Sequence, residues 1–364
     1  MSDETPRASG TRFSLWKKIV FGVCGTLLGL IVLEGAATGI AIGYDLLTQA
    51  PPPAVTELSE EKHAQYDQEL GWVNTPNVQL RDHYGPGKTI TINSQGLRGL
   101  QDHERDDVFR VICLGDSFTL GYGVDDRETF PFLLNDKLQS DVEVVNMGQG
   151  GYSVGQDYLW LKRLAPTLKP KLVVCVFITE DFRRLGTVRT ANGFGTPQFD
   201  VIGDSIEVSN IPVPAKLSVG ESLPVAYNFT TTLTRHSVLA RSLANMVPGE
   251  EIDPDEHALY VGAHILLEIQ RLCQKIDCGM VVALTPTLPE VFDVSAAVRY
   301  QQYVNALSGF LSEQGIPFRD LSPAFDQAVA QSYFLDEAFH HYSPQGNEVV
   351  AGELYEWIGP IMPK

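Results

Sequence analysis

The chain has 364 residues, of which 44% are hydrophobic, and its 45 acidic and 27 basic side chains give a formal net charge of −18. This length and apolar content are enough to bury a full core, so we expect one large domain or one domain with an insertion. The negative charge repels polyanions. Nucleic acid is therefore excluded as an expected partner, and binding through an anionic lipid surface is unfavourable.

An apolar stretch near the N-terminus predicts a transmembrane helix. Residues 19–44 carry a single charge, Glu34, and a helix of this length, rising about 1.5 Å per residue, can span a hydrocarbon core of roughly 30 Å. Four basic residues precede the stretch, and the next basic residue is Lys62. The positive-inside rule therefore predicts that residues 1–18 are cytoplasmic and that the domain after the anchor lies outside the cytoplasm, at the cell membrane.

A cleaved signal peptide is the competing interpretation of the same stretch. Residues 19–33 alone resemble the apolar core of a signal peptide, and the small residues Gly35, Ala36 and Ala37 follow. We favour the uncleaved anchor because the apolar character resumes after Glu34.

The remainder of the chain divides into a linker and one domain. Pro51-Pro52-Pro53 favours a stiff polyproline spacer, and we assign residues 45–70 to this linker and residues 71–364 to the domain. About residues 183–254 interrupt the regular pattern of the domain with Gly, Pro, Asn and short alternating runs. An interval of this length is functional or carries its own structure. This insertion either shapes a substrate cleft or is a β-hairpin that only extends the fold.

Alternating apolar and amphipathic segments predict the fold class of the domain. Continuous Val/Ile/Leu runs followed by segments of helical period are typical of parallel strands buried between two layers of helices. We predict an α/β fold of the three-layer α/β/α, flavodoxin-like type around a mainly parallel five-stranded sheet. The expected strands are residues 109–114, 142–147, 171–178, 279–284 and 317–321, and the expected helices are residues 128–138, 154–164, 256–275 and 295–314.

Polar or glycine-rich segments follow three of these strands. Open parallel sheets bind ligands beyond the carboxyl ends of their strands, so these segments are expected to meet. Gly115-Asp116-Ser117 follows the first strand, residues 146–153 (NMGQGGYS) the second, and residues 178–182 (ITEDF) the third. A fourth segment, residues 336–347 (DEAFHHYSPQGN), leads into the expected last helix.

Together the four segments hold the parts that acyl transfer needs. Ser117 stands where a buried strand ends, which suits a nucleophile, and the glycine-rich turn leaves N–H groups free for an oxyanion. The last segment supplies a histidine as base and an acid to orient it. Gly-Asp-Ser alone is an ordinary capped turn, but the four segments in order outweigh that interpretation. The five cysteines form no metal-ligand pattern, and neither a metal nor a cofactor is expected.

These segments resemble the SGNH, or GDSL-type, hydrolase superfamily, and in particular a membrane-anchored branch of it. The likeness lies in GDSFTLGYG, NMGQGG and HYSPQGNEVVA, together with ITINSQGLRG and FITEDF, and runs from about Gly71 to the C-terminus. The resemblance implies that Ser117 is the nucleophile and that its own N–H and that of Gly151 donate to the oxyanion. It also implies that His341 is the general base and Asp336 the acid that orients it.

The third segment departs from the family pattern. The family has Gly-x-Asn-Asp, in which the Asn side chain donates to the oxyanion, whereas this chain has Ile178-Thr179-Glu180-Asp181. A carboxylate at Glu180 repels the developing negative charge, and loss of one donor typically costs about 3 kcal/mol. Three interpretations stay open: Glu180 is protonated, Glu180 turns away while Thr179 donates, or the site is impaired.

The acid is also irregularly spaced. In the family it precedes the histidine by three residues, but that position before His341 is an alanine. Asp336 lies five residues before His341, whereas Glu337 lies three before His340. We rank Asp336 with His341 above the alternative pair Glu337 and His340, because the Gly-Asn pair that follows His341 has the family spacing.

Three functions are consistent with this sequence. The leading hypothesis is a membrane-anchored, extracytoplasmic serine esterase or acyl hydrolase that uses a Ser-His-Asp triad on an O-acyl ester, either a small ester or an O-acylated glycan. An O-acyltransferase would pass the acyl group of the same acyl-enzyme to a glycan. The third hypothesis is a non-catalytic glycan-binding or assembly protein on a degenerate scaffold, and Glu180 and the irregular acid spacing motivate it.

Overall fold

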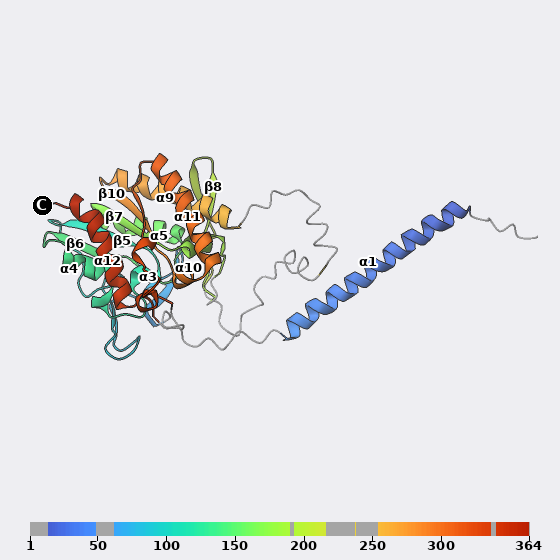
Figure 1. Cartoon of the computed structure of the whole chain (residues 1–364), viewed down its shortest axis with the longest axis horizontal. Coiled ribbons are helices and arrows are strands. Elements are labelled where there is room, and N and C mark those ends of the chain that lie inside the picture. Colours follow the sequence, from blue (N-terminus) through green and yellow to red (C-terminus); the bar gives the residue numbers. More distant parts are fainter. Residues whose placement is uncertain are drawn as a thin grey trace, which may run out of the picture. The chain divides into compact units, whose positions relative to one another are not determined.

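The computed structural model describes residues 14–48, 62–189, 193–215, 237, 254–335 and 340–363. The chain forms two compact units, one of which comprises Met1–Thr56 and Ser218–Glu251 and the other Glu57–Leu217 and Ile252–Lys364. Helix α1 (Leu15–Thr48) belongs to the first unit, and all other described helices and strands belong to the second (Figure 1).

Helix α1 contains the apolar stretch that the sequence singled out. Its segment Leu15–Ile40 is long and apolar enough to cross a membrane, judged by length and composition. The helix extends beyond the expected residues 19–44 at both ends. An N-terminal apolar helix, which the predicted fold class included, is therefore present.

A five-stranded parallel sheet forms the centre of the second unit. Its strand order is β11-β10-β7-β5-β6, and every neighbouring pair is parallel. Numbered along the chain, the five strands lie in the order 2-1-3-4-5, which is the flavodoxin-like arrangement. The predicted fold class is confirmed. The strands are β5 (Phe109–Leu114), β6 (Val142–Asn146), β7 (Leu172–Phe177), β10 (Gly279–Leu284) and β11 (Phe318–Asp320).

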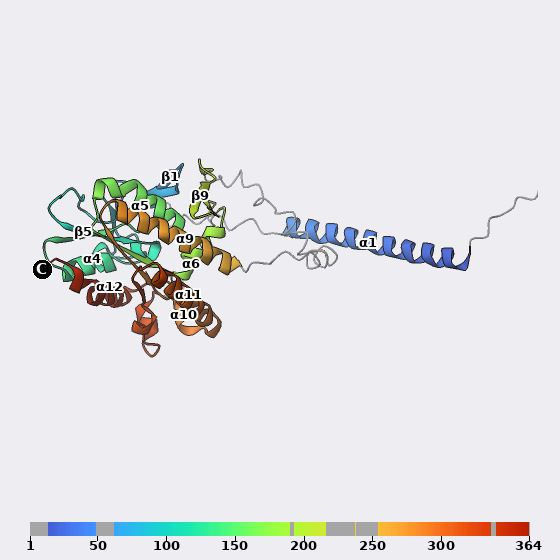
Figure 2. The same cartoon turned by 90° about the horizontal axis from the view of Figure 1, so that it is seen from above.

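Two layers of helices cover the two faces of this sheet. Figure 2 shows α5 and α9 on one side of β5 and α4 and α12 on the other. One apolar core joins α5, α9 and α11 to the sheet, and a second joins α4 and α12 to the opposite face. The helices are α4 (Phe130–Lys137), α5 (Val154–Leu168), α9 (Pro254–Lys275), α11 (Val294–Glu313) and α12 (Pro344–Ile358).

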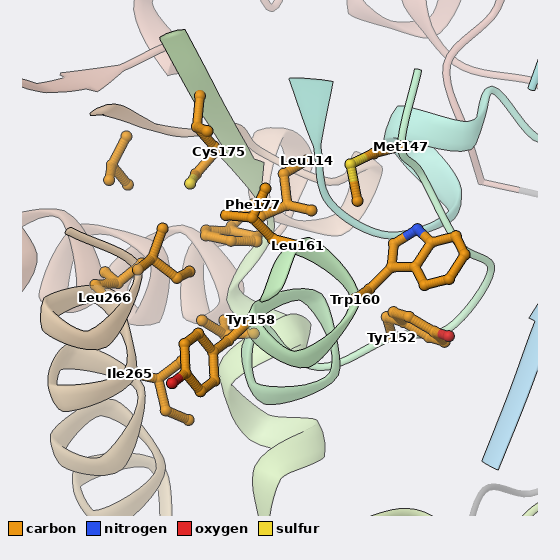
Figure 3. Close-up of a cluster of buried hydrophobic side chains, with 14 of the residues drawn as sticks. Leu114, Met147, Tyr152, Tyr158, Trp160, Leu161, Cys175, Phe177, Ile265 and Leu266 are labelled. Carbon is orange, nitrogen blue, oxygen red and sulfur yellow. The ribbon is translucent and has the colours of Figure 1, made fainter. Parts of the chain in front are cut away.

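The strands serve both cores because side chains alternate between the two faces of a sheet. In β5, Ile112 and Leu114 pack with α5 and α9, whereas Val111 and Cys113 pack with α4 and α12. Figure 3 shows part of the first core, including Leu114. Burial on both faces is the physical reason why the strands appear in the sequence as continuous apolar runs.

The segment before β5 carries more structure than the sequence indicated. Strands β1 (Ala64–Asp67) and β2 (Gly71–Asn74) form an antiparallel hairpin, as do β3 (Val78–Leu80) and β4 (Ile90–Ile92). The turn between β1 and β2 forms because a carboxylate oxygen of Asp67 accepts the backbone N–H of Glu69 and Leu70, both at 2.9 Å. Strand β1 therefore lies within residues 45–70, the range assigned to the linker.

The insertion contains a β-hairpin that packs on the domain. Strands β8 (Gln198–Ile202) and β9 (Ser205–Ser209) are antiparallel, and the buried Phe199 of β8 belongs to the core around α5. A Cβ at Gly155 of α5 would approach the Phe199 ring to 2.3 Å, so the two surfaces are in close contact. The short elements are α3 (Ser117–Leu120), α6 (Thr179–Arg183), α10 (Leu288–Phe292) and the 3₁₀ turns Asp126–Glu128, Arg184–Gly186, Ser322–Ala324, Ala330–Tyr333 and Gly359–Ile361.

Phe199→Ala tests whether the insertion hairpin is part of the core. Removing this buried ring is expected to lower the free energy of unfolding by about 3 kcal/mol, because the substitution leaves a cavity against α5. Ile202→Ala on the same strand is the matched control, since Ile202 is 59% exposed and should change stability by less than about 0.5 kcal/mol. Urea unfolding measures both, and equal effects of the two substitutions would show that the hairpin does not pack as described.

Candidate active site

Ser117 is the first residue of α3 and stands directly beyond the carboxyl end of β5. Asp116 caps this helix, because its Oδ1 accepts the backbone N–H of Phe118 at 2.9 Å. At the preceding position only glycine fits, since a Cβ at Gly115 would lie 2.3 Å from the carbonyl oxygen of Val176 in the neighbouring strand. Ser117 is buried but lines a pocket of about 650 Å³.

His341 meets Ser117 at this pocket. Its Nε2 lies 2.7 Å from the Ser117 Oγ, although the two residues are 224 positions apart in the chain. The imidazole ring packs against Phe118 and Tyr122, with ring centroids 4.6 and 4.9 Å away. The backbone N–H of Leu335 donates to the His341 carbonyl at 2.7 Å, which fixes the entry to α12. The sequence-predicted pair of Ser117 and His341 is therefore in hydrogen-bond contact.

The adjacent histidine occupies a different position. His340 has a left-handed backbone with φ of 49°, and its side chain is exposed, although it lines the same pocket. The structure brings His341 and not His340 within hydrogen-bond distance of Ser117. The two candidate acids, Asp336 and Glu337, lie outside the described residues.

The glycine-rich segment after β6 packs directly against α3. A Cβ at Gly148 would lie 2.1 Å from the backbone nitrogen of Leu120 in α3, so a larger residue cannot take this place. Asn146 Oδ1 accepts the Gly148 N–H at 3.0 Å, and Gly115 accepts the N–H of Gln149 at 3.1 Å. Gly151 has a left-handed backbone with φ of 73° and lines the pocket with Ser117.

Strand β2 supports this glycine-rich segment from the other side. Trp72 Nε1 donates to the Gly150 carbonyl at 2.8 Å, and Asn74 Nδ2 donates to the Gly148 carbonyl at 3.3 Å. The hydroxyl of Tyr152 donates in return to the Trp72 carbonyl at 2.5 Å. Trp72 and Asn74 were not predicted from the sequence as site residues, because no catalytic motif contains them.

Glu180 is paired with a cation, and no hydrogen bond joins it to Ser117. Its Oε2 lies 2.7 Å from Nη1 of Arg183, one turn later in the chain, and its side chain is 45% exposed. Thr179 was the alternative donor to an oxyanion, but its hydroxyl donates to Oε1 of Glu290. Both residues line the pocket. The interpretation in which Thr179 replaces the family asparagine is therefore not supported by its hydrogen bond.

Arg184, which lines the pocket, pairs with two buried carboxylates. Nη1 of Arg184 is 2.8 Å from Asp116 Oδ2 and 2.6 Å from Asp181 Oδ1, and it also donates to the Tyr152 carbonyl at 2.9 Å. Asp157 of α5 is fully buried nearby. Burial raises the pKa of the Asp157 carboxyl well above its usual range, and the negative charge of Asp116 adds to this effect.

Within the described parts of the chain, no group of three or more His, Cys, Asp or Glu residues could hold a metal ion.

The segment of the chain that carries most of these site residues matches a known protein family. A model of the GDSL-like lipase/acylhydrolase family matches residues 113–349, which include Ser117, Gly151 and His341. The chain is a member of this family. The resemblance noted in the sequence is thereby confirmed, and with it the expectation of an SGNH-type ester hydrolase. A comparison with curated proteins gave no match.

Several solved structures of esterases are similar to this chain. The psychrotrophic esterase EstA of a Pseudoalteromonas species is 12% identical, with a TM-score of 0.42, and the match covers 69% of this chain and 97% of EstA. A catalytic mutant of an acetylxylan esterase from Geobacillus stearothermophilus is 14% identical, with a TM-score of 0.42 and coverage of 70% and 96%. The aryl esterase of M. smegmatis is 12% identical, with a TM-score of 0.39 and coverage of 70% and 99%.

Protonation of His63 makes the free energy of unfolding depend on pH. Burial lowers the pKa of His63 from 6.5 to about 4, although Asn74 Oδ1 lies 3.2 Å from its Nδ1. The unfolded chain takes up the proton near pH 6.5 and the folded chain only near pH 4. The stability contributed by neutral His63 is therefore complete above pH 6.5 and declines as the pH falls towards 4, by about 3 kcal/mol in all.

The His63→Gln variant should lack this component of acid sensitivity. We expect its free energy of unfolding to fall by about 2–3 kcal/mol less than that of the wild type between pH 7 and pH 4, measured by urea unfolding of the full chain in detergent. His257→Gln, at an exposed position on α9, should follow the wild type. A parallel loss of stability in wild type and His63→Gln would contradict the assignment.

Proposed function

We propose that this protein is a serine ester hydrolase that forms an acyl-enzyme on Ser117, with His341 as the general base and Asp336 as the acid that orients it. The observation that carries the proposal is the 2.7 Å separation of Ser117 Oγ and His341 Nε2 at the wall of the pocket. Membership in the GDSL-like lipase/acylhydrolase family supports the same chemistry.

The reaction follows from the roles of these two side chains. His341 Nε2 takes the hydroxyl proton while Ser117 Oγ attacks the ester carbonyl, and a tetrahedral oxyanion forms. When the intermediate collapses, the imidazolium returns the proton to the leaving alcohol, and the acyl group stays on Ser117. Water activated by His341 then attacks the acyl-enzyme, which releases the carboxylic acid and regenerates the serine.

The developing oxyanion needs fixed donors near Ser117. In this proposal the backbone N–H groups of Ser117 and Gly151 supply two of them, because both residues line the same pocket and the glycine-rich segment packs against α3. Glu180 occupies the position of the third family donor. Its ion pair with Arg183 draws the carboxylate towards a cation and so reduces the repulsion that it exerts on the oxyanion.

The proposed substrate is an O-acyl ester, either a small ester or the acyl group of an acylated glycan. Trp72 and Phe194 line the pocket with their rings 5.3 Å apart, and such aromatic walls suit a flat, partly apolar ligand. In this proposal the catalytic groups react only with the ester group, so the mechanism places no requirement on the size of the alcohol.

We place the enzyme at the cell membrane, with α1 as the anchor and the domain on the extracytoplasmic side. The helix offers a continuous apolar segment, Leu15–Ile40, and the side chains described there are almost all exposed, as a lipid-facing helix requires. The basic residues before the helix and the lack of basic residues immediately after it support the orientation.

Substitution of the nucleophile and the base tests the proposed mechanism. Ser117→Ala should abolish labelling by a fluorophosphonate and lower the hydrolysis of p-nitrophenyl acetate by at least about 10³-fold. His341→Gln should reduce the rate to a similar extent, whereas His340→Gln should reduce it by less than about 10-fold. Hydrolysis that survives Ser117→Ala would refute the mechanism, and a larger loss in His340→Gln than in His341→Gln would reverse the assignment of the base.

Substitution of Glu180 tests the electrostatic cost of the third position. Glu180→Asn introduces the donor that the family uses and removes the charge, so kcat is expected to rise by about 10-fold or more. Glu180→Ala removes only the charge and should raise kcat by a smaller factor, about 3-fold. An unchanged or lower kcat in both variants would show that Glu180 does not act on the oxyanion.

A glycan-binding protein without catalytic activity is the second candidate function. The departure that favours it is Glu180, whose carboxylate stands where the family has a neutral donor, together with the engaged hydroxyl of Thr179. The fluorophosphonate experiment separates the two candidates, because a binding protein would leave Ser117 unlabelled while retaining affinity for the glycan.

A further inference from the structure

Arg184 touches three active-site segments with one nitrogen atom. Nη1 contacts Asp116 in the nucleophile segment at 2.8 Å, the Tyr152 carbonyl next to Gly151 at 2.9 Å, and Asp181 in the third segment at 2.6 Å. We propose that Arg184 is a positioning residue that holds these three segments in the register in which Ser117 and the Gly151 N–H can act on one carbonyl group. The proposal rests on the proposed function, because it assigns Arg184 a role in that reaction.

The three segments need such a link because each follows a different strand. The nucleophile segment follows β5, the glycine-rich segment follows β6, and the third segment follows β7. The sheet aligns the ends of these strands, but its strand pairing ends at about Leu114, Asn146 and Phe177, and beyond it one backbone hydrogen bond, from Gln149 N–H to the Gly115 carbonyl at 3.1 Å, joins the first two segments. Beyond those residues the distance from Ser117 Oγ to the Gly151 N–H depends on contacts between the segments themselves. A displacement of about 1 Å in such a site can cost about 10²-fold in rate.

The contacts of Arg184 with Asp116 and Asp181 are ion pairs, which makes them stronger than hydrogen bonds between neutral groups. The side chains of Asp116 and Asp181 are 1% and 0% exposed, and Arg184 is 23% exposed. Burial opposes the charge on Arg184, but Asp116 and Asp181 outweigh it, so the net effect raises the pKa of Arg184. The guanidinium therefore stays protonated throughout the working pH range.

Asp116 connects Arg184 to the nucleophile itself. Its Oδ2 faces Arg184, its Oδ1 accepts the N–H of Phe118, and Oδ2 also lies 3.4 Å from Ser117 Oγ. Asp116 Oδ2 is already a second acceptor for the Ser117 hydroxyl, at a longer distance than the 2.7 Å to His341 Nε2, and rotation of the carboxylate would remove the cap of α3 and release the restraint on that longer distance. By holding Oδ2, Arg184 keeps Asp116 as the cap of α3 and favours His341 as the acceptor of the serine proton.

Removal of the Arg184 side chain tests the proposal. A second variant separates the effect of lost positioning from the effect of unbalanced buried charge. Arg184→Gln leaves two buried carboxylates without their cation and should be less stable. In Arg184→Gln/Asp181→Asn one of those charges is gone, and the amide oxygen of the second substitution can still accept the backbone N–H of Ile178, as Asp181 does. Arg271→Gln is the control, because Arg271 forms an ion pair with Glu268 on α9, away from the pocket.

The measurements are made on the full chain in detergent: urea unfolding, kcat and KM for p-nitrophenyl acetate, and the rate of fluorophosphonate labelling of Ser117. We expect the double variant to recover most of the lost stability, while kcat and the labelling rate stay at least 10-fold below wild type and KM changes by less than about 3-fold. The control should match wild type in all four.

Two results would overturn the proposal and they are distinguishable. A double variant that is stable and labels at the wild-type rate would show that Arg184 only balances buried charge, while the proposed hydrolase would stand. A wild-type chain that neither labels nor hydrolyses the ester would refute the proposed function and, with it, the role of Arg184.

Discussion

The close approach of backbone to backbone beyond three neighbouring strands is the constraint on which the site depends. Gly115 lies against the end of β7, and Gly148 lies against α3, at distances that leave no room for a Cβ. The parallel sheet brings β6, β5 and β7 side by side, and the glycines allow the segments beyond them to converge. Ser117 and the glycine-rich turn thus line one pocket. Side chains at Gly115 and Gly148 would prevent the packing that brings them together.

Side chains from outside these segments then stabilise what the backbone brings together. Trp72 and Asn74 of β2 donate to the carbonyls of Gly150 and Gly148, so the hairpin before the family-matched residues 113–349 is part of the structure around the site. Such hydrogen bonds occupy carbonyl groups of the turn and so hold its backbone in one orientation. In this chain the support for the glycine-rich turn comes from a segment far away in the sequence.

The charges around the pocket divide into a buried set and an accessible set. Arg184 lines the pocket and is shared by the buried Asp116 and Asp181, whereas Arg183 pairs with Glu180 and both of those side chains are more exposed. The buried set is costly to disturb because uncompensated charge in the interior is unfavourable, and it suits a role in holding geometry. Rearranging the accessible pair costs less free energy. This part of the site can therefore tolerate a departure from the family pattern.

The sequence by itself determined the strands, the α/β class and the candidate nucleophile, because these depend on local patterns: apolar runs for β5, β6, β7 and β10, and a Gly-Asp-Ser turn at the end of the first. It ranked His341 above the adjacent His340 as the candidate base, from the spacing of the Gly-Asn pair that follows. Only the tertiary structure decided that His341 and not His340 meets Ser117, that Glu180 pairs with Arg183, and that Arg184 joins three segments. Periodicity reports how a residue sits within its own element, whereas these contacts depend on side-chain directions across segments up to 224 residues apart.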